Sequence, residues 1–395
     1  MKKYIALFLI LLAALPLVQC SKRSNPVDVA KPQGGFFMNN YYSTNVGNDY
    51  MNDPPYRHIL VYLPPGYDTS GVIRYPVLYL LHGYGGDDTY YKGLYSVGNI
   101  LDDMINSGEI QPMIVVTPDA NNQFGGSFYT NSPEVGGRSF AGNMETFVAN
   151  EVVDYVDSTY YTLTDRHHRG ISGHSMGGYG AVKLAMLHNN LFGSASSMSG
   201  PLAFWGGMPY DSSFTGLFEL INFVFAENGG APNDTLGTFY RITPGPGKRL
   251  TNMMFAMASA FSPHDPANPD LTYAHFYRTI MSTGYVDLPF DSSGAPVDTV
   301  WHSWLRNDVS AIAASGLAGV FAPDSTPLYI DAGDRDDLGF QYQTQAFDTL
   351  LTLSGIPHTF AIYSGGGGPY IADHTMLIAT RIIEVLKFHN EVFKR

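Results

Sequence analysis

The chain has 395 residues, 45% hydrophobic and 14% charged, which excludes a disordered protein because such chains lack the apolar surface that offsets ordering entropy. A single cysteine excludes a disulfide framework and a cysteine-ligated zinc site. With 22 basic and 35 acidic residues the net charge is −13, so no nucleic-acid partner is expected, because that binding requires clustered cations.

The N-terminus has the pattern of an export signal. Two lysines precede an apolar run over residues 4–18, which is short for a membrane span and typical of a signal peptide. The run ends in Leu-Val-Gln-Cys, which resembles a bacterial lipobox, although Gln stands where a small residue is usual. We predict a signal peptide over residues 1–20 with lipidation at Cys20; plain secretion and a retained anchor are the alternatives.

Residues 21–35 are rich in Ser, Lys, Arg, Pro and Gly and have no apolar periodicity, so they predict a tether. The folded domain is expected over residues 36–395. Removal of the two signal lysines leaves 20 cations against 35 acids, a charge of −15. We therefore expect an extracytoplasmic protein that meets the membrane only through its lipid.

Short apolar segments alternate with segments of helical period, the pattern of a mostly parallel sheet covered by helices. The sequence therefore predicts an α/β fold. The expected strands are residues 58–63, 76–81, 113–117, 169–172, 194–198, 328–331 and 359–363, and the expected helices are residues 143–160, 178–189, 341–353 and 374–392.

The alternation stops between about residues 201 and 322, where helical pieces over 215–226 and 250–260 are joined by loops rich in Pro and Asp. An insertion between two strands of one sheet can cover the strand ends, where sites form in such folds. We interpret this segment as a helical cap; a decorative subdomain and a dimer surface are the alternatives.

The sharpest motif is Gly-His-Ser-Met-Gly at residues 173–177, between a predicted strand and a predicted helix. In a G-x-S-x-G nucleophile elbow the serine occupies a strained turn, and glycines flank it because side chains would collide there. The motif predicts Ser175 as nucleophile. The amide of Met176, at the positive end of the helix, is expected to stabilise an oxyanion.

A second glycine-rich turn, Leu-His-Gly-Tyr-Gly-Gly at residues 81–86, follows an earlier strand. The other oxyanion donor of this architecture comes from such a turn, and we assign it to the Tyr84 amide. His82 precedes the nucleophile in the chain and ends a strand, so we expect it to make a structural hydrogen bond.

The nucleophile needs a neutral imidazole as base and a carboxylate to orient that imidazole. The turn after the strand 328–331 offers four carboxylates, and we rank Asp336 first and Asp337 second. His374 lies after the last strand and before the last helix, which predicts it as the base. No metal or other cofactor is expected.

The loop after the strand 113–117 carries Phe124, Phe128 and Tyr129. These rings could stack on a sugar or a phenolic ring of a substrate, although aromatic residues in loops also serve in packing.

The motifs at residues 62–67, 80–83, 117–119 and 173–181 together resemble the putative-esterase family of α/β-hydrolases, which contains esterase D, feruloyl and acetyl-xylan esterases of carbohydrate esterase family one, and the antigen 85 mycolyltransferases. The resemblance implies an α/β-hydrolase fold. It places the family's nucleophile, acid and base on Ser175, Asp336 and His374, and its oxyanion amides on Tyr84 and Met176.

Two departures concern substrate choice. Relatives usually have His-Asp followed by Trp near the base, whereas here Asp373 precedes His374, and the insertion is longer than in compact members. The resemblance implies a carboxylic-ester hydrolase that forms an acyl-enzyme, with feruloyl or acetyl esters of polysaccharides as substrates. The alternatives are an acyltransferase of the antigen 85 type and an inactive surface binding protein; the oligomeric state stays open.

Overall fold

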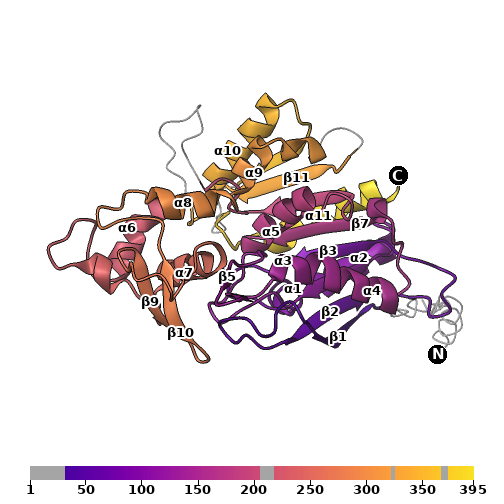
Figure 1. The fold of residues 1–395 in the computed structure, drawn as a ribbon. Helices are drawn as coiled ribbons and strands as arrows, with labels where there is room; N and C mark the ends of the chain where they lie inside the picture. Colours follow the sequence, from indigo (N-terminus) through magenta and orange to yellow (C-terminus); the bar gives the residue numbers. More distant parts are fainter. Residues whose placement is uncertain (1–31, 205–217, 322–324, 366–371) are drawn as a thin grey trace, which may run out of the picture. The chain divides into compact units, whose positions relative to one another are not determined.

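The computed structural model describes residues 32–204, 218–321, 325–365 and 372–395 (Figure 1). The predicted signal peptide, Cys20 and most of the predicted tether lie outside the described residues. Residues Gln33–Arg395 form one compact unit.

An eight-stranded sheet forms the centre of this unit (Figure 1). The first three strands of the spatial order pair antiparallel and the rest pair parallel, which confirms the predicted α/β fold with a mostly parallel sheet. In spatial order the strands are β1 (Gly35–Tyr42), β2 (Tyr56–Leu63), β4 (Ile114–Pro118), β3 (Val77–Leu81), β7 (Arg169–His174), β8 (Ser194–Met198), β11 (Leu328–Gly333) and β12 (Thr359–Tyr363).

Helices cover both faces of the sheet because its central strands are apolar on both sides. In β3, Val77, Tyr79 and Leu81 contribute to one buried cluster, whereas Leu78 and Leu80 contribute to the other. The first cluster packs under α3 (Met144–Thr146), which continues through a π-helical turn (Phe147–Val152) into α4 (Val153–Thr159), and under α5 (Met176–Leu187) and α10 (Phe340–Leu353). The second packs under α1 (Tyr90–Tyr95), α2 (Val97–Ser107) and α11 (Ile378–Phe393).

Four elements of this frame differ from the sequence-based expectations. Strand β1 was not expected; it begins at Gly35, the last residue of the predicted tether, and its residues are exposed or half-buried, so they lack an apolar signal. Helices α1 and α2 were not expected either. The last helix begins at Ile378, so the predicted base at residue 374 lies in the loop before it.

The insertion, the segment between β8 and β11, contains both expected helical pieces as α6 (Phe218–Glu227) and α7 (Arg249–Phe261). It is not purely helical, because a hairpin of β9 (Ala274–Arg278) and β10 (Thr283–Asp287) follows α7. The conformation of these residues is determined by pairing across the hairpin and not by a helical pattern of apolar residues. Two further helices, α8 (Asp298–Leu305) and α9 (Val309–Ala314), lead back to the sheet.

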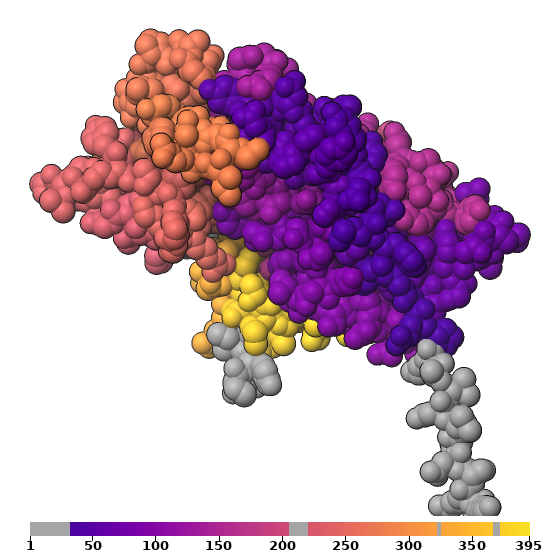
Figure 2. Space-filling view, turned by 90° about the horizontal axis from the view of Figure 1, so that it is seen from below, coloured from indigo at the N-terminus to yellow at the C-terminus, as the bar shows by residue number. Residues whose placement is uncertain are grey.

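Two groups of hydrogen bonds that join the insertion to the sheet domain reach α5 and the loop of Gln123. Near α9, the Asn307 carbonyl accepts a hydrogen bond from Tyr179 Oη (2.6 Å) and its side chain accepts one from Lys183 Nζ (3.0 Å), both on α5. At the hairpin tip, the Met281 amide donates to Gln123 Oε1 (3.0 Å). In Figure 2 the salmon and orange atoms of the insertion accordingly lie against the indigo and purple atoms of the N-terminal half.

A pair of buried carboxyl groups, Asp49 and Asp53, supports the loop that carries Gln123. Asp49 Oδ1 accepts the Asp53 amide (2.9 Å), and Asp53 Oδ1 accepts the Gln123 amide (3.1 Å). Burial and the neighbouring charge of Asp49 raise the pKa of Asp53 to about 8, although Arg57 opposes the rise. Asp53 is therefore protonated in the folded protein at neutral pH.

This raised pKa makes stability depend on pH in a definite direction. Between the unfolded pKa of 3.8 and the folded value of about 8, the folded chain holds a proton that the unfolded chain has released. The contribution of Asp53 to the free energy of unfolding is thus full below about pH 4 and is lost as the pH rises through about 8.

We expect Asp53→Asn, which mimics the protonated acid, to flatten the fall in the free energy of unfolding between about pH 5 and 8. Urea unfolding across this range measures the slope. Asp68→Asn is the matched control, because hydrogen bonds from Ser70 and nearby amides lower the pKa of Asp68 to about 2, below the range tested. Equal slopes for the wild type and the Asp53 variant would contradict the assignment.

Candidate active site

The turn between β7 and α5 holds Ser175 in a strained conformation. Its φ of 58° and ψ of −123° lie in a region that non-glycine residues rarely occupy. Helix α5 can start at once because Gly177 lies directly on β3: a Cβ there would stand 1.9 Å from the Leu81 carbonyl oxygen. The elbow glycine thus allows a close approach of helix and strand that any other residue would prevent.

Three side chains from separate segments form one hydrogen-bonded chain. The Ser175 hydroxyl lies 2.8 Å from His374 Nε2, and His374 Nδ1 lies 2.8 Å from Asp336 Oδ2. All three residues are buried, with Ser175 the most exposed at 7%. The structure therefore brings together the three residues that the sequence predicts as nucleophile, base and acid.

The environment of Asp336 favours its ionised form. Burial raises the pKa of Asp336, but the hydrogen bond and charge of His374, the Leu338 amide and the Ser199 hydroxyl together hold it below its usual value. An ionised Asp336 accepts a hydrogen bond from His374 Nδ1–H, which keeps the ring proton on Nδ1 and leaves the Nε2 lone pair to accept the serine proton.

The competing carboxylates of the acid turn have other partners. Asp331 is fully buried and pairs with Arg381, whose Nε lies 2.9 Å from Oδ1. The second-ranked candidate, Asp337, faces solvent and forms an exposed ion pair with Arg249 of the insertion (3.3 Å). A backbone hydrogen bond from Arg335 to the Ala372 carbonyl (3.0 Å) ties the acid turn to the loop of the base.

The two predicted oxyanion donors flank one glycine. A Cβ on Gly126 would stand 2.6 Å from Met176 Sδ and 2.9 Å from the Tyr84 ring, so both side chains pack on this residue. Among the described residues, neither the Met176 nor the Tyr84 amide donates a hydrogen bond to another protein group. Both amides thus have a donor to offer a ligand.

His82 is occupied by the backbone, as expected. Its Nδ1 donates to the Gly83 carbonyl (2.9 Å) and its Nε2 accepts the Ala120 amide (3.1 Å). Burial lowers the pKa of His82, which keeps it neutral. Both ring nitrogens of this histidine thus bond the backbone, which connects the turn of Tyr84 to the following loop.

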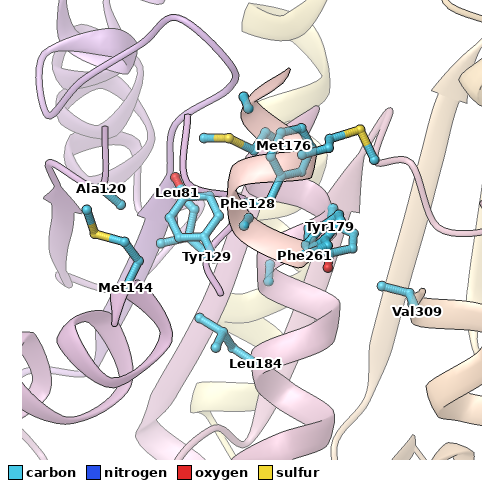
Figure 3. Packing of buried hydrophobic residues seen from close by; sticks show 14 of the residues in the cluster. Leu81, Ala120, Phe128, Tyr129, Met144, Met176, Tyr179, Leu184, Phe261 and Val309 are labelled. Carbon is cyan, nitrogen blue, oxygen red and sulfur yellow. The ribbon is translucent and has the colours of Figure 1, made fainter. Parts of the chain in front are cut away.

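The interpretation of Phe124, Phe128 and Tyr129 as stacking surfaces is wrong. All three are buried, with exposures of 8%, 1% and 0%. Figure 3 shows Phe128 and Tyr129 inside the core beside α5, and the Phe128 ring lies 5.9 Å from the rings of both Tyr179 and Phe261. Rings of the insertion cover two of them, because Phe124 packs on Phe255 and Tyr277, and Phe128 packs on Phe261.

The described part of the chain contains no cluster of three or more His, Cys, Asp or Glu residues that could hold a metal ion. None of its helices combines the length and the apolar character that a membrane crossing requires.

Sequence reasoning missed three residues that surround the triad. His174, inside the elbow motif, donates from Nε2 to the carbonyl oxygen of His374 (2.7 Å). Arg381 donates a hydrogen bond to Ser199 Oγ (3.0 Å), and the Ser199 hydroxyl forms a hydrogen bond with Asp336 that lowers the pKa of this acid. The position of His174 directly before the nucleophile could have indicated its role. Arg381 and Ser199 are an ordinary helical arginine and an ordinary loop serine, so only the tertiary structure shows their place beside the triad.

A mostly parallel sheet with a serine on its strand-to-helix elbow, and with an acid and a histidine after its last two strands, defines an α/β-hydrolase. A solved ferulic acid esterase has this fold: it superposes with a TM-score of 0.53 at 20% identity, covering 92% of this chain and 100% of that chain. Residues 52–235 match the family described as "Putative esterase", so the predicted resemblance to this family is confirmed over that segment.

Two named relatives match part of the chain. An esterase of Mycobacterium tuberculosis is 39% identical over 143 residues, which are 36% of this chain and 28% of the relative. An endo-1,4-beta-xylanase/feruloyl esterase of Xylanibacter ruminicola is 33% identical over 145 residues, 35% of this chain and 19% of the relative. The chain thus matches less than a third of the length of either relative.

We expect Asp336→Asn to slow the reaction of Ser175 with a fluorophosphonate probe by about 10³–10⁴, because an amide cannot hold the imidazole in the required tautomer. Asp337→Asn is the matched control: its exposed ion pair is worth little, so the rate should change by no more than about twofold. Labelling rates followed by mass spectrometry measure both. A large loss in the Asp337 variant alone would reassign the acid.

Proposed function

We propose that the protein is a serine carboxylic-ester hydrolase that works through an acyl-enzyme. One observation carries the proposal: Ser175, held on a strained elbow, is linked at 2.8 Å to His374, which is linked at 2.8 Å to Asp336. The family match over residues 52–235 and the name of the mycobacterial relative support the same chemistry.

In the first half-reaction, Ser175 Oγ attacks the ester carbonyl carbon while its proton passes to His374 Nε2. The carbonyl oxygen becomes an oxyanion facing the amides of Tyr84 and Met176. When the tetrahedral intermediate collapses, the bond to the alcohol oxygen breaks, and His374 returns the proton to that oxygen. The alcohol leaves, and the acyl group stays on Ser175.

In the second half-reaction, water gives a proton to His374 Nε2 as it attacks the acyl carbon. Collapse then breaks the bond to Ser175 Oγ, which recovers the proton, and the carboxylic acid leaves. Asp336 stays ionised throughout because its lowered pKa favours the charge beside the imidazolium. Each oxyanion amide is worth about 10²–10³ in rate.

We propose feruloyl or acetyl esters of polysaccharides as substrates. The name of the Xylanibacter ruminicola relative, which joins a xylanase with a feruloyl esterase, supports this class. Such substrates are met outside the cytoplasm, in agreement with the export signal and lipobox predicted at residues 1–20.

We expect Ser175→Ala to abolish release of ferulate from methyl ferulate and of p-nitrophenol from short-chain esters. The melting temperature should stay nearly unchanged, because the lost hydroxyl contributes little packing and its removal leaves an alanine of similar shape. Steady-state assays and thermal unfolding test this. Hydrolysis retained by the variant would refute Ser175 as nucleophile, and an inactive wild type would favour a surface binding protein.

Acyl transfer is the alternative fate of the same acyl-enzyme. The two reactions separate when an aryl ester is supplied with and without an added sugar or alcohol. We expect free acid to remain the main product; ester product outrunning free acid would instead identify a transferase.

Lipidation is tested at Cys20. When the full chain is expressed in a bacterium that processes lipoproteins, we expect the wild type to incorporate a labelled fatty acid and to enter the detergent phase. The Cys20→Ser variant should do neither, because serine lacks the thiol to which the lipid is attached. A wild type recovered unlabelled from the medium would indicate plain secretion.

A further inference from the structure

The residue before the nucleophile, His174, contacts the predicted base twice. Its Nε2 donates a hydrogen bond to the carbonyl oxygen of His374 (2.7 Å). Its ring also lies against the His374 imidazole, with centroids 4.8 Å apart and planes tilted by 40°. His174 is 1% exposed, so both contacts are shielded from water.

A tyrosine selects the tautomer that these contacts require. Tyr90 Oη lies 2.8 Å from His174 Nδ1, and its hydroxyl donates there, which leaves the ring proton on Nε2. Burial, together with the nearby charges of His374 and Arg381, holds the pKa of His174 well below its ordinary value. His174 therefore stays neutral even when its neighbour becomes an imidazolium.

Within the loop that carries His374, this contact holds the base residue itself. Its neighbours are held by other bonds: the Ala372 carbonyl accepts the amide of Arg335 from the acid turn, and the Asp373 side chain accepts the amides of Thr375 and Met376. The described contact to the carbonyl of His374 itself comes from His174. The residue next to the nucleophile thus holds the backbone of the base.

We propose that His174, with its tautomer set by Tyr90, is a positioning residue that fixes the His374 imidazole between Ser175 and Asp336. The proposal rests on the proposed ester hydrolysis. The elbow thereby positions both partners of the proton transfer. It positions Ser175 through its strained backbone, and it positions His374 through the side chain of His174.

Three variants test the proposal on full-length protein. His174→Phe keeps a ring but loses the donor, and we expect kcat for methyl ferulate to fall about 10–100-fold, with KM changed by no more than about threefold, because a small misplacement of the base affects chemistry more than binding. His174→Gln can place an amide donor near Nε2 and should recover part of kcat. Tyr90→Phe keeps the ring that packs on Gly86 and should lower kcat about 3–10-fold.

His389→Phe is the matched control. His389 is equally buried and bonds Ser194 (2.7 Å) and Ser196 (3.0 Å) under β8, away from the triad. We expect it to lower the melting temperature as His174→Phe does while kcat stays unchanged. The low-field proton NMR signal of His374 Nδ1–H reports the bond to Asp336 directly; it should shift or broaden in His174→Phe and persist in His389→Phe.

Unchanged kcat and an unchanged low-field signal in His174→Phe would overturn the proposal, as would losses of equal size in the His389 control. If His174→Phe does not fold, Tyr90→Phe decides, because it leaves the His174 ring in place. A wild type without esterase activity would instead refute the proposed function, while the NMR signal would still show whether His174 positions His374.

Discussion

The site depends on one close contact, that of the first turn of α5 with the end of β3. Because Gly177 lies on the Leu81 carbonyl, the helix can begin directly after β7, and Ser175 must take a positive φ to make the turn. That conformation exposes the hydroxyl, aims the first amides of the helix toward it, and costs strain that the surrounding sheet must offset. The position of the Ser175 hydroxyl is therefore determined first by steric fit and only then by charge.

The second constraint on the site is electrostatic and concerns the charge of Asp336. The buried pair of Asp331 and Arg381 lies beneath the acid turn, and Arg381 reaches Ser199, whose hydroxyl helps to keep Asp336 ionised. A buried ion pair contributes little stability on net, but it holds its neighbours in one arrangement. Here it fixes the Arg381 guanidinium, which donates to Ser199, and the Ser199 hydroxyl in turn helps to hold the pKa of Asp336 below its usual value.

The insertion is bonded to the nucleophile helix as well as to the sheet. Asn307 receives hydrogen bonds from Tyr179 and Lys183 on α5, and the hairpin tip bonds to Gln123 in the loop that packs on Tyr84 and Met176. A shift of the insertion would thus reach both sides of the oxyanion region.

By itself the sequence determined the α/β class, seven strands of the sheet and the three segments that supply Ser175, Asp336 and His374, because apolar periodicity and a glycine-flanked serine are local signals. Tertiary structure alone decided which carboxylate faces the histidine, that Phe128 and Tyr129 belong to the core, and that His174 and Arg381 surround the triad. Strand β1 and the hairpin β9–β10 were not predicted, for the same reason. Their stability comes from pairing with another strand, and the identity of that strand cannot be read from the pattern of apolar residues in a single sequence.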